Sequence, residues 1–134
     1  MLPSALSVTF VTDKVTEARE FYEKYFGAKA SFDCGWYVVL KLGGNANGQE
    51  VGFMEPQNGA QPYAGGAMLN LAFPEVDAFH AEISGRGIVP TMPLEDHPWG
   101  DRGFAVVDPL GTMVYCLTPI EVTDEFRAFQ IDLS

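Results

Sequence analysis

The period of hydrophobic and polar positions changes along the chain, and this change predicts the first elements. Residues 6–11, "LSVTFV", alternate small polar side chains with Val8 and Phe10, which is typical of a strand with one apolar face. Residues 17–27, "EAREFYEKYFG", place aromatic side chains at helical spacing, and Gly27 is expected to end the helix. Three β-rich runs follow, and the turn-forming "GGNANGQ" at 43–49 separates the last two: "KASFDC" (29–34), "WYVVLKL" (36–42) and "EVGFMEP" (50–56). The first part of the chain therefore predicts the order βαβββ.

The same order of elements starts again near residue 67. "MLNLAF" at 68–73 is expected to be a strand, and "VDAFHAEISGRG" at 76–87 a helix that ends at a glycine. Three further strands are expected, with the turn "DPLG" between the last two: "IVPTMPL" (88–94), "RGFAVVD" (102–108) and "TMVYCLTP" (112–119). "VGFMEP" at 51–56 and "VYCLTP" at 114–119 hold the same place in their halves. Two copies of one supersecondary unit predict a pseudo-twofold domain of the α+β class.

The length and composition of the chain fit one domain over residues 1–134. We expect a first module at about 4–58, a linker rich in glycine and proline at about 59–66, and a second module at about 67–120. The tail, 121–134, is expected to form one short helix that Thr123 caps, with Phe126 and Phe129 on one side.

The charge and cysteine content exclude several classes of partner. Eighteen acidic residues against eight basic ones give a net charge of -10, which disfavours nucleic acid and anionic membrane surfaces. No stretch approaches the roughly 18 apolar residues that span a bilayer, and "MLPSALSVTF" lacks the features of a signal peptide. Cys34 and Cys116 show no CxxC spacing, so we expect reduced, buried thiols in a cytoplasmic protein.

The repeat and three of its segments resemble the vicinal oxygen chelate superfamily, which includes glyoxalases, bleomycin-resistance proteins and extradiol dioxygenases. The segments are "FYEKYFGA" in the first helix, "VDAFHAEISGRG" in the second, and "PWGDRGFAVVDPLG" before the last strand. The resemblance covers residues 4–119. It implies two βαβββ modules that form a cupped, partly open mixed β-sheet barrel, with the helices outside and a small organic ligand inside. It also implies a homodimer, in which the modules of each cup come from one subunit or are swapped between two.

Enzymes of this superfamily commonly hold a divalent metal with His and Glu side chains from the first and last strands of each module. The corresponding positions here are Ser7, Gly52, Met68 and Tyr115. None of these is a residue type that suits such a site. We therefore expect no metal and no other cofactor.

The strand pattern supports this alignment and predicts what lines the cup. If Ser7 and Thr9 face the ligand, Val8 and Phe10 face the helix; a shift by one residue would bury unpaired hydroxyls at about 1–3 kcal/mol each. Methionines dominate the expected lining, which suits a flat organic molecule. The lining residues are Ser7, Thr9, Gly52, Met54, Met68, Asn70, Met113 and Tyr115, with Trp36, Tyr37 and Trp99 at the rim.

These observations favour a metal-free binding protein that sequesters a planar or aromatic molecule, as bleomycin-resistance proteins do in antibiotic resistance. The alternative is a glyoxalase-like lyase, isomerase or dioxygenase with displaced or absent metal ligands, and a third class is a regulatory or structural dimer. The candidate catalytic groups are His97 paired with Asp96 or Asp101, Tyr115 as an acid, and Glu50 and Glu55.

The positions of these groups argue against the enzyme. His97 is expected in a loop and Glu55 at a strand end, so the pattern does not predict that they converge. We expect Asp101 to form a local ion pair with Arg102 and His80 to lie on a solvated helix surface.

Overall fold

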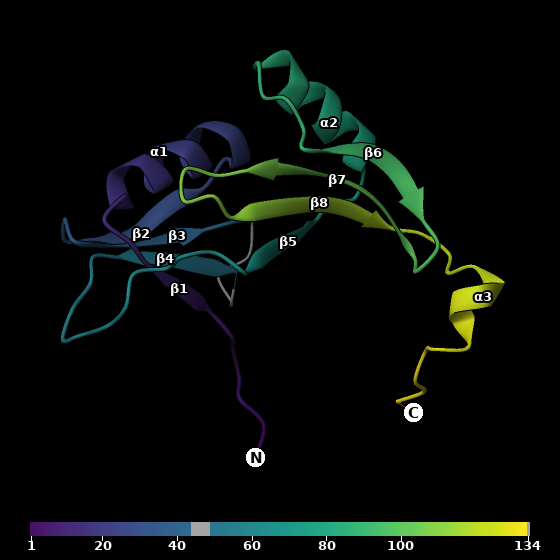
Figure 1. Cartoon of the computed structure of the whole chain (residues 1–134), viewed down its shortest axis with the longest axis horizontal. Coiled ribbons are helices and arrows are strands. Elements are labelled where there is room, and N and C mark those ends of the chain that lie inside the picture. Colours follow the sequence, from purple (N-terminus) through teal and green to yellow (C-terminus); the bar gives the residue numbers. More distant parts are fainter. Residues whose placement is uncertain (44–48, 134) are drawn as a thin grey trace. The chain divides into compact units, whose positions relative to one another are not determined.

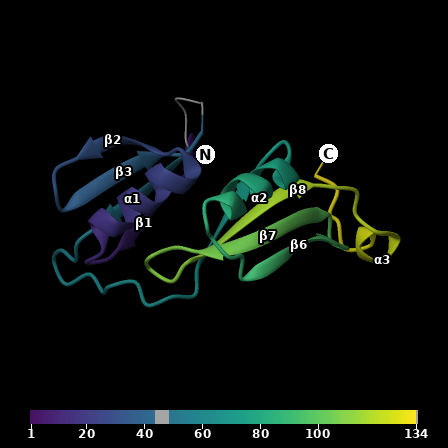
Figure 2. The ribbon, with the colours of Figure 1, turned by 90° about the horizontal axis from the view of Figure 1, so that it is seen from above.

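The computed structural model describes residues 1–43 and 49–133, which fall into two compact units. Unit 1 comprises Met1–Gly66 together with the turn Asp108–Gly111, and unit 2 comprises Ala67–Val107 and the chain from Thr112 onward. Each unit has a four-stranded mixed sheet with one helix against one of its faces (Figures 1 and 2). The turn expected at 43–49 lies mostly outside the described residues.

Unit 1 has a sheet with the strand order β1-β4-β3-β2, in which β1 runs parallel to β4. The side chain of Phe53 lies between the helix and the first strand, stacking on Tyr22 at 5.6 Å and on Phe10 at 5.8 Å between ring centroids. Because side chains alternate along a strand, Thr9 therefore faces away from the helix, as the register predicted. The elements are β1 (Val8–Val11), α1 (Val15–Phe26), β2 (Lys29–Asp33), β3 (Tyr37–Lys41) and β4 (Glu50–Met54).

Unit 2 repeats this arrangement with the strand order β5-β8-β7-β6, and β5 runs parallel to β8. Phe79 of the helix stacks on Phe73 at 4.2 Å and packs against Phe104 at 6.2 Å. The elements are β5 (Met68–Ala72), α2 (Val76–Gly85), β6 (Met92–His97), β7 (Asp101–Val107), β8 (Met113–Pro119) and α3 (Asp124–Arg127). The predicted α+β class with two tandem βαβββ modules is thus confirmed.

No helix in the described part of the chain is long and apolar enough to cross a membrane.

Two predicted strand boundaries are wrong. The sixth strand was expected at 88–94, but β6 runs from Met92 to His97, because Asp96 and His97 pair with Arg102 and Asp101 of β7. The first strand starts one residue after Ser7, which is exposed. In the tail, the short helix α3 (Asp124–Arg127) follows Thr123 as predicted, and the rings of Phe126 and Phe129 lie on one side, 5.9 Å apart. The Thr123 hydroxyl, however, does not cap the helix and donates to the carbonyl oxygen of Pro98 instead.

Two expectations about single side chains are also wrong. Cys116 is a buried free thiol as predicted, but Cys34 is exposed because it lies between β2 and β3, outside the core. The ring of His80 is half-buried and meets Phe104 edge-on at 4.8 Å, because its position on α2 faces the sheet.

Candidate functional site

The face of the unit 1 sheet opposite α1 carries four of the predicted binding residues: Thr9, Tyr37, Gly52 and Met54. Thr9 pairs with Gly52 across β1 and β4, and Tyr37 pairs with Met54 across β3 and β4. A Cβ atom on Gly52 would lie 2.7 Å from the Thr9 hydroxyl oxygen and 3.2 Å from Cε1 of Tyr37. The two side chains therefore close over the glycine, and a larger residue there would displace them.

Three aromatic rings form a continuous surface beside this glycine, which we call the aromatic platform: Phe32, Trp36 and Tyr37. Tyr37 contacts Phe32 at 5.7 Å and stacks on Trp36 at 6.0 Å with an interplanar angle of 27°. Phe32 is 50% exposed and Trp36 42% exposed. The sequence pattern predicted Trp36 and Tyr37 but missed Phe32, because a register shift between Ala30 and Phe32 interrupts the alternation of β2.

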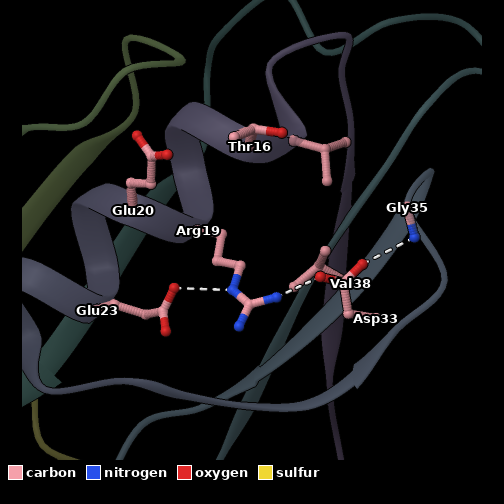
Figure 3. A pocket seen from close by; sticks show the side chains of 8 residues that line it. Thr16, Arg19, Glu20, Glu23, Asp33, Gly35 and Val38 are labelled. Atoms are coloured by element: carbon pink, nitrogen blue, oxygen red, sulfur yellow. Dashed lines mark hydrogen bonds and ion pairs between the residues drawn. The ribbon is translucent and has the colours of Figure 1, made fainter.

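The opposite, helix-bearing side of unit 1 has a shallow cavity of about 320 Å³ between α1 and the β2–β3 strands (Figure 3). The Arg19 guanidinium bridges the elements there: its Nε donates to Glu23 at 2.8 Å and its Nη1 to Asp33. The hydrogen bond to Glu23 chiefly raises the pKa of Arg19. This arginine is already held by two carboxylates, and no predicted binding residue lines the cavity.

In unit 2, the four predicted binding residues of β5 and β8 share the sheet face opposite α2. Met68 pairs with Met113 and Asn70 with Tyr115. Gly103 lies on the same face of β7, where a Cβ atom would stand 2.7 Å from the Tyr115 ring and 2.5 Å from the carbonyl oxygen of Cys116. The phenol of Tyr115 therefore crosses β7 over a glycine, toward the end of β6.

Five side chains form a connected group around the hydroxyl of Tyr115. The Asp101 carboxylate accepts hydrogen bonds from the Tyr115 hydroxyl and, at 2.8 Å, from Nε1 of Trp99. Nδ1 of His97 lies 2.8 Å from Oδ1 of Asp101, and Nε2 lies 3.4 Å from Oε1 of Glu95. The indole of Trp99 stacks on the imidazole at 4.7 Å with an interplanar angle of 2°. We call Glu95, His97, Trp99, Asp101 and Tyr115 the polar network.

The polar network changes the titration of two of its members. Burial by itself would raise the pKa of Asp101, but the hydrogen bonds from Tyr115, His97 and Trp99 hold it below its ordinary value. Burial raises the pKa of Tyr115, and the hydrogen bond to Asp101 and the charge of that carboxylate raise it further. Near neutral pH the phenol therefore keeps its proton and the carboxylate stays ionised.

The expected ion pair between Asp101 and Arg102 is wrong, and the open choice between Asp96 and Asp101 as the partner of His97 is resolved. Asp101 forms no ion pair with Arg102 among the contacts described, because alternation along β7 places the two side chains on opposite faces. Arg102 instead binds Asp77 of α2 at 2.8 and 3.0 Å and Asp96 at 3.1 Å. Asp96 therefore lies on the helix side, and Asp101 is the carboxylate that pairs with His97.

The convergence that the sequence did not predict is thus present for His97, Asp101 and Tyr115. It is absent for the two other candidates in the described structure. Glu50 lies 3.9 Å from Lys41 at the start of β4, and Glu55 is exposed beyond the end of that strand.

The Trp99 loop is tied to the C-terminal segment. The carbonyl oxygen of Pro98 accepts hydrogen bonds from the backbone nitrogen and the hydroxyl of Thr123 at 3.0 and 3.1 Å. The Trp99 ring also meets Phe126 of α3 at 6.2 Å. The tail therefore holds the indole that covers His97.

The residues at the superfamily's metal positions do not fit a divalent metal. In unit 1, the space of a side chain at Gly52 is taken by Thr9 and Tyr37. In unit 2, Met68 offers a thioether, and the Tyr115 hydroxyl is bound to Asp101 with a raised pKa. The part of the chain that is described holds no group of three or more His, Cys, Asp or Glu side chains placed to bind a metal ion.

Comparison with known proteins places this chain in a family. The model of the Glyoxalase/Bleomycin resistance protein/Dioxygenase superfamily matches residues 5–115, so the chain belongs to that superfamily. A comparison with curated protein sequences gives no significant match.

Solved structures share the fold at low sequence identity. A glyoxalase/bleomycin resistance protein/dioxygenase from Nocardioides is 18% identical, with a TM-score of 0.71 over 90% of this chain and 86% of the other. A superfamily member from Sphaerobacter thermophilus is 23% identical, with a TM-score of 0.69 over 87% and 98% of the two chains. A lactoylglutathione lyase from Agrobacterium tumefaciens is 21% identical, with a TM-score of 0.65 over 88% and 96%.

Proposed function

We propose that this chain is a metal-independent binding protein for a small planar or aromatic organic molecule. The aromatic platform carries the proposal, because Phe32 and Trp36 are half exposed beside Tyr37 on the sheet face opposite α1. A planar ligand stacked on such rings gains about 0.5–1.5 kcal/mol beyond the burial of its area. Exposed aromatic clusters of this kind are typical of binding sites.

The surroundings of the platform suit a flat, weakly polar molecule. Met54 is half-buried next to Tyr37, and Thr9 supplies a hydroxyl beside Gly52. A methionine adapts its shape to a ligand, and one hydroxyl gives a polar contact that orients it. The net charge of -10 favours a neutral or cationic ligand over an anion.

The residues at the superfamily's metal positions do not suit a divalent metal, and this supports the metal-independent part of the proposal. The superfamily includes proteins named for resistance and proteins named as enzymes, so its fold is compatible with both. The side chains of this chain favour the metal-independent class, because Gly52 and Met68 provide no ligand for a hard or borderline metal ion.

Fluorescence of Trp36 tests ligand binding directly. In a Trp99→Phe background, Trp36 is the remaining tryptophan, since the chain has two. We expect saturable quenching by 2-methoxynaphthalene and 2-naphthol, and an affinity about ten-fold lower in Tyr37→Leu because a stacking ring is lost. Val89→Ala is the matched control, since Val89 is an exposed apolar residue of unit 2 with 82% of its surface accessible.

Two results would contradict the proposal. Quenching that rises linearly without saturation, or equal affinity in the parent and Tyr37→Leu, would remove the platform as a binding site. Equilibrium dialysis against Zn²⁺ and Ni²⁺ tests the other half, where we expect no stoichiometric uptake. One tightly bound ion per chain would show that the protein depends on a metal after all.

A further inference from the structure

The two ring nitrogens of His97 have partners of different kinds. Nδ1 lies 2.8 Å from Asp101, whose side chain is 15% exposed and is also held by Trp99 and Tyr115. Nε2 lies 3.4 Å from Glu95, whose side chain is 57% exposed and for which that contact is long. One side of the imidazole is therefore fixed within the protein, while the Glu95 side chain beside the other nitrogen can move away.

The contacts also decide where the imidazole carries its proton. The Tyr115 hydroxyl lies 2.8 Å from Nδ1 as well as close to Oδ1 of Asp101. If the hydroxyl donated to Nδ1, the lone pair of that nitrogen would stand 2.8 Å from a carboxylate oxygen with no proton between them. An ionised carboxylate can accept both donors, so the hydroxyl and Nδ1–H both donate to Asp101. In the neutral ring, Nε2 then has the free lone pair. The Glu95 carboxylate 3.4 Å away shares no proton with that lone pair and, with 57% of its side chain exposed, can turn toward solvent.

We infer that Nε2 of His97 is a recognition site for a proton-bearing group of a bound organic molecule, a hydroxyl or an amine N–H, which takes the place of Glu95. His97 accepts the hydrogen bond, while Asp101 and Trp99 are positioning residues that fix the tautomer and the ring. The carboxylates of Asp101 and Glu95 flank the imidazole, so the ligand class is neutral or cationic and anions are disfavoured.

Gly103 also contributes to the arrangement that holds Asp101 and His97 in place. It leaves the space that lets the Tyr115 ring cross β7, and the phenol then supplies one of the donors that keep Asp101 in place. The inference deepens the proposed function, because it names the chemical group that unit 2 recognises; it depends on that proposal only for the planar shape of the probes.

The first arm of the test needs no ligand. Nitrogen NMR of the histidine rings, in a His80→Asn variant that leaves His97 as the remaining histidine, reports which ring nitrogen is protonated. We expect the Nδ1–H tautomer, and we expect the preference to be lost in Asp101→Asn. Asp96→Asn is the matched control, because that carboxylate binds Arg102 on the helix side. An Nε2–H tautomer in the His80→Asn protein would overturn the inference.

The second arm uses three naphthalene probes of one shape. 2-Naphthol offers a hydroxyl, 2-methoxynaphthalene replaces its proton by a methyl group, and 2-naphthoate is an anion. We expect 2-naphthol to shift the Nε2 resonance of His97. In titrations followed by the His97 resonances, 2-naphthol should bind about ten-fold more tightly than the methyl ether, and 2-naphthoate should bind most weakly. Asp101→Asn should remove the preference for the hydroxyl, and Asp96→Asn should retain it.

The readouts separate failure of this inference from failure of the proposed function. If 2-naphthol leaves the His97 resonances unchanged, or binds no better than its methyl ether, the inference is overturned. If the methyl ether still quenches Trp36 with saturation, the proposed function stands without it. If no naphthalene quenches Trp36, the proposed function fails, and the response of His97 to 2-naphthol decides the inference independently.

Discussion

Both units place a glycine beneath a tyrosine on the sheet face away from the helix, yet the two tyrosines make different kinds of contact. Tyr37 passes beside Gly52 and joins Phe32 and Trp36 in an apolar platform. Tyr115 passes over Gly103, and its hydroxyl reaches Asp101. The repeated backbone thus provides the same kind of space twice, and the neighbouring side chains decide whether it holds stacked rings or a hydrogen-bonded network.

Substituting each glycine should break this comparison with the largest effect. In Gly103→Ala, the new Cβ would stand 2.5 Å from the Cys116 carbonyl oxygen, a backbone atom that cannot move aside. In Gly52→Ala, the nearest atom is the Thr9 hydroxyl, at the end of a side chain that can rotate. We expect the free energy of unfolding to fall by about 3 kcal/mol and about 1 kcal/mol, respectively.

Urea denaturation of both variants measures this difference. Gly85→Ala is the control, since nothing lies within 4 Å of its added Cβ atom. Equal losses in Gly103→Ala and Gly52→Ala would show that the backbone of β8 yields as easily as a side chain.

The fold and one half of the candidate site follow from local pattern. Alternation in β1 and β5 predicted which side chains leave the helix, because a sheet covered on one face must put its apolar residues there. Thr9, Tyr37, Gly52 and Met54 accordingly share a face as expected.

The other half depends on long-range pairing that local pattern does not contain. Residues 95–97, "EDH", are polar on both faces and therefore do not resemble a half-buried strand. The structure extends β6 through them because Asp96 meets Arg102 on one face and His97 meets Asp101 on the other. The polar network joins three strands, so its members could be suspected singly but not assembled from sequence.

A second pair of tyrosines separates a structural contact from one at the candidate site. In unit 1 the buried Tyr22 hydroxyl donates to Asp108 at 2.6 Å, and Asp108 is 5% exposed. Tyr22→Phe removes a donor from a buried carboxylate, and we expect a loss of about 2 kcal/mol in unfolding free energy. Tyr115→Phe should cost about 1 kcal/mol, because Asp101 keeps the donors from Trp99 and His97.

Thermal and urea unfolding of the two variants tests this order. Tyr25→Phe on the same helix serves as the control, with an expected change within about 0.5 kcal/mol. A larger loss in Tyr115→Phe than in Tyr22→Phe would mean that the polar network, and not the Tyr22–Asp108 contact, is the more important for stability.

The smallest expected effect is on the pH dependence of the unfolding free energy, which should reveal the contribution of Asp101 in the polar network. The pKa of Asp101 is lower in the folded protein than its unfolded value of about 4. Its hydrogen bonds therefore contribute stability above about pH 4, and the contribution is lost as the pH falls through the lowered folded pKa. Asp101→Asn carries no such proton, so its stability should depend less steeply on pH in that range.

Urea denaturation of the parent and Asp101→Asn, repeated from about pH 7 down to about pH 3, gives the difference in unfolding free energy at each pH. We expect this difference to be constant at the upper end and to shrink below about pH 4. Tyr115→Phe should show an intermediate slope, since it removes one of the donors that lower the pKa of Asp101. A difference that stayed constant over the whole range would mean that Asp101 titrates alike in the folded and unfolded chains, and that the donors around it do not stabilise its charge.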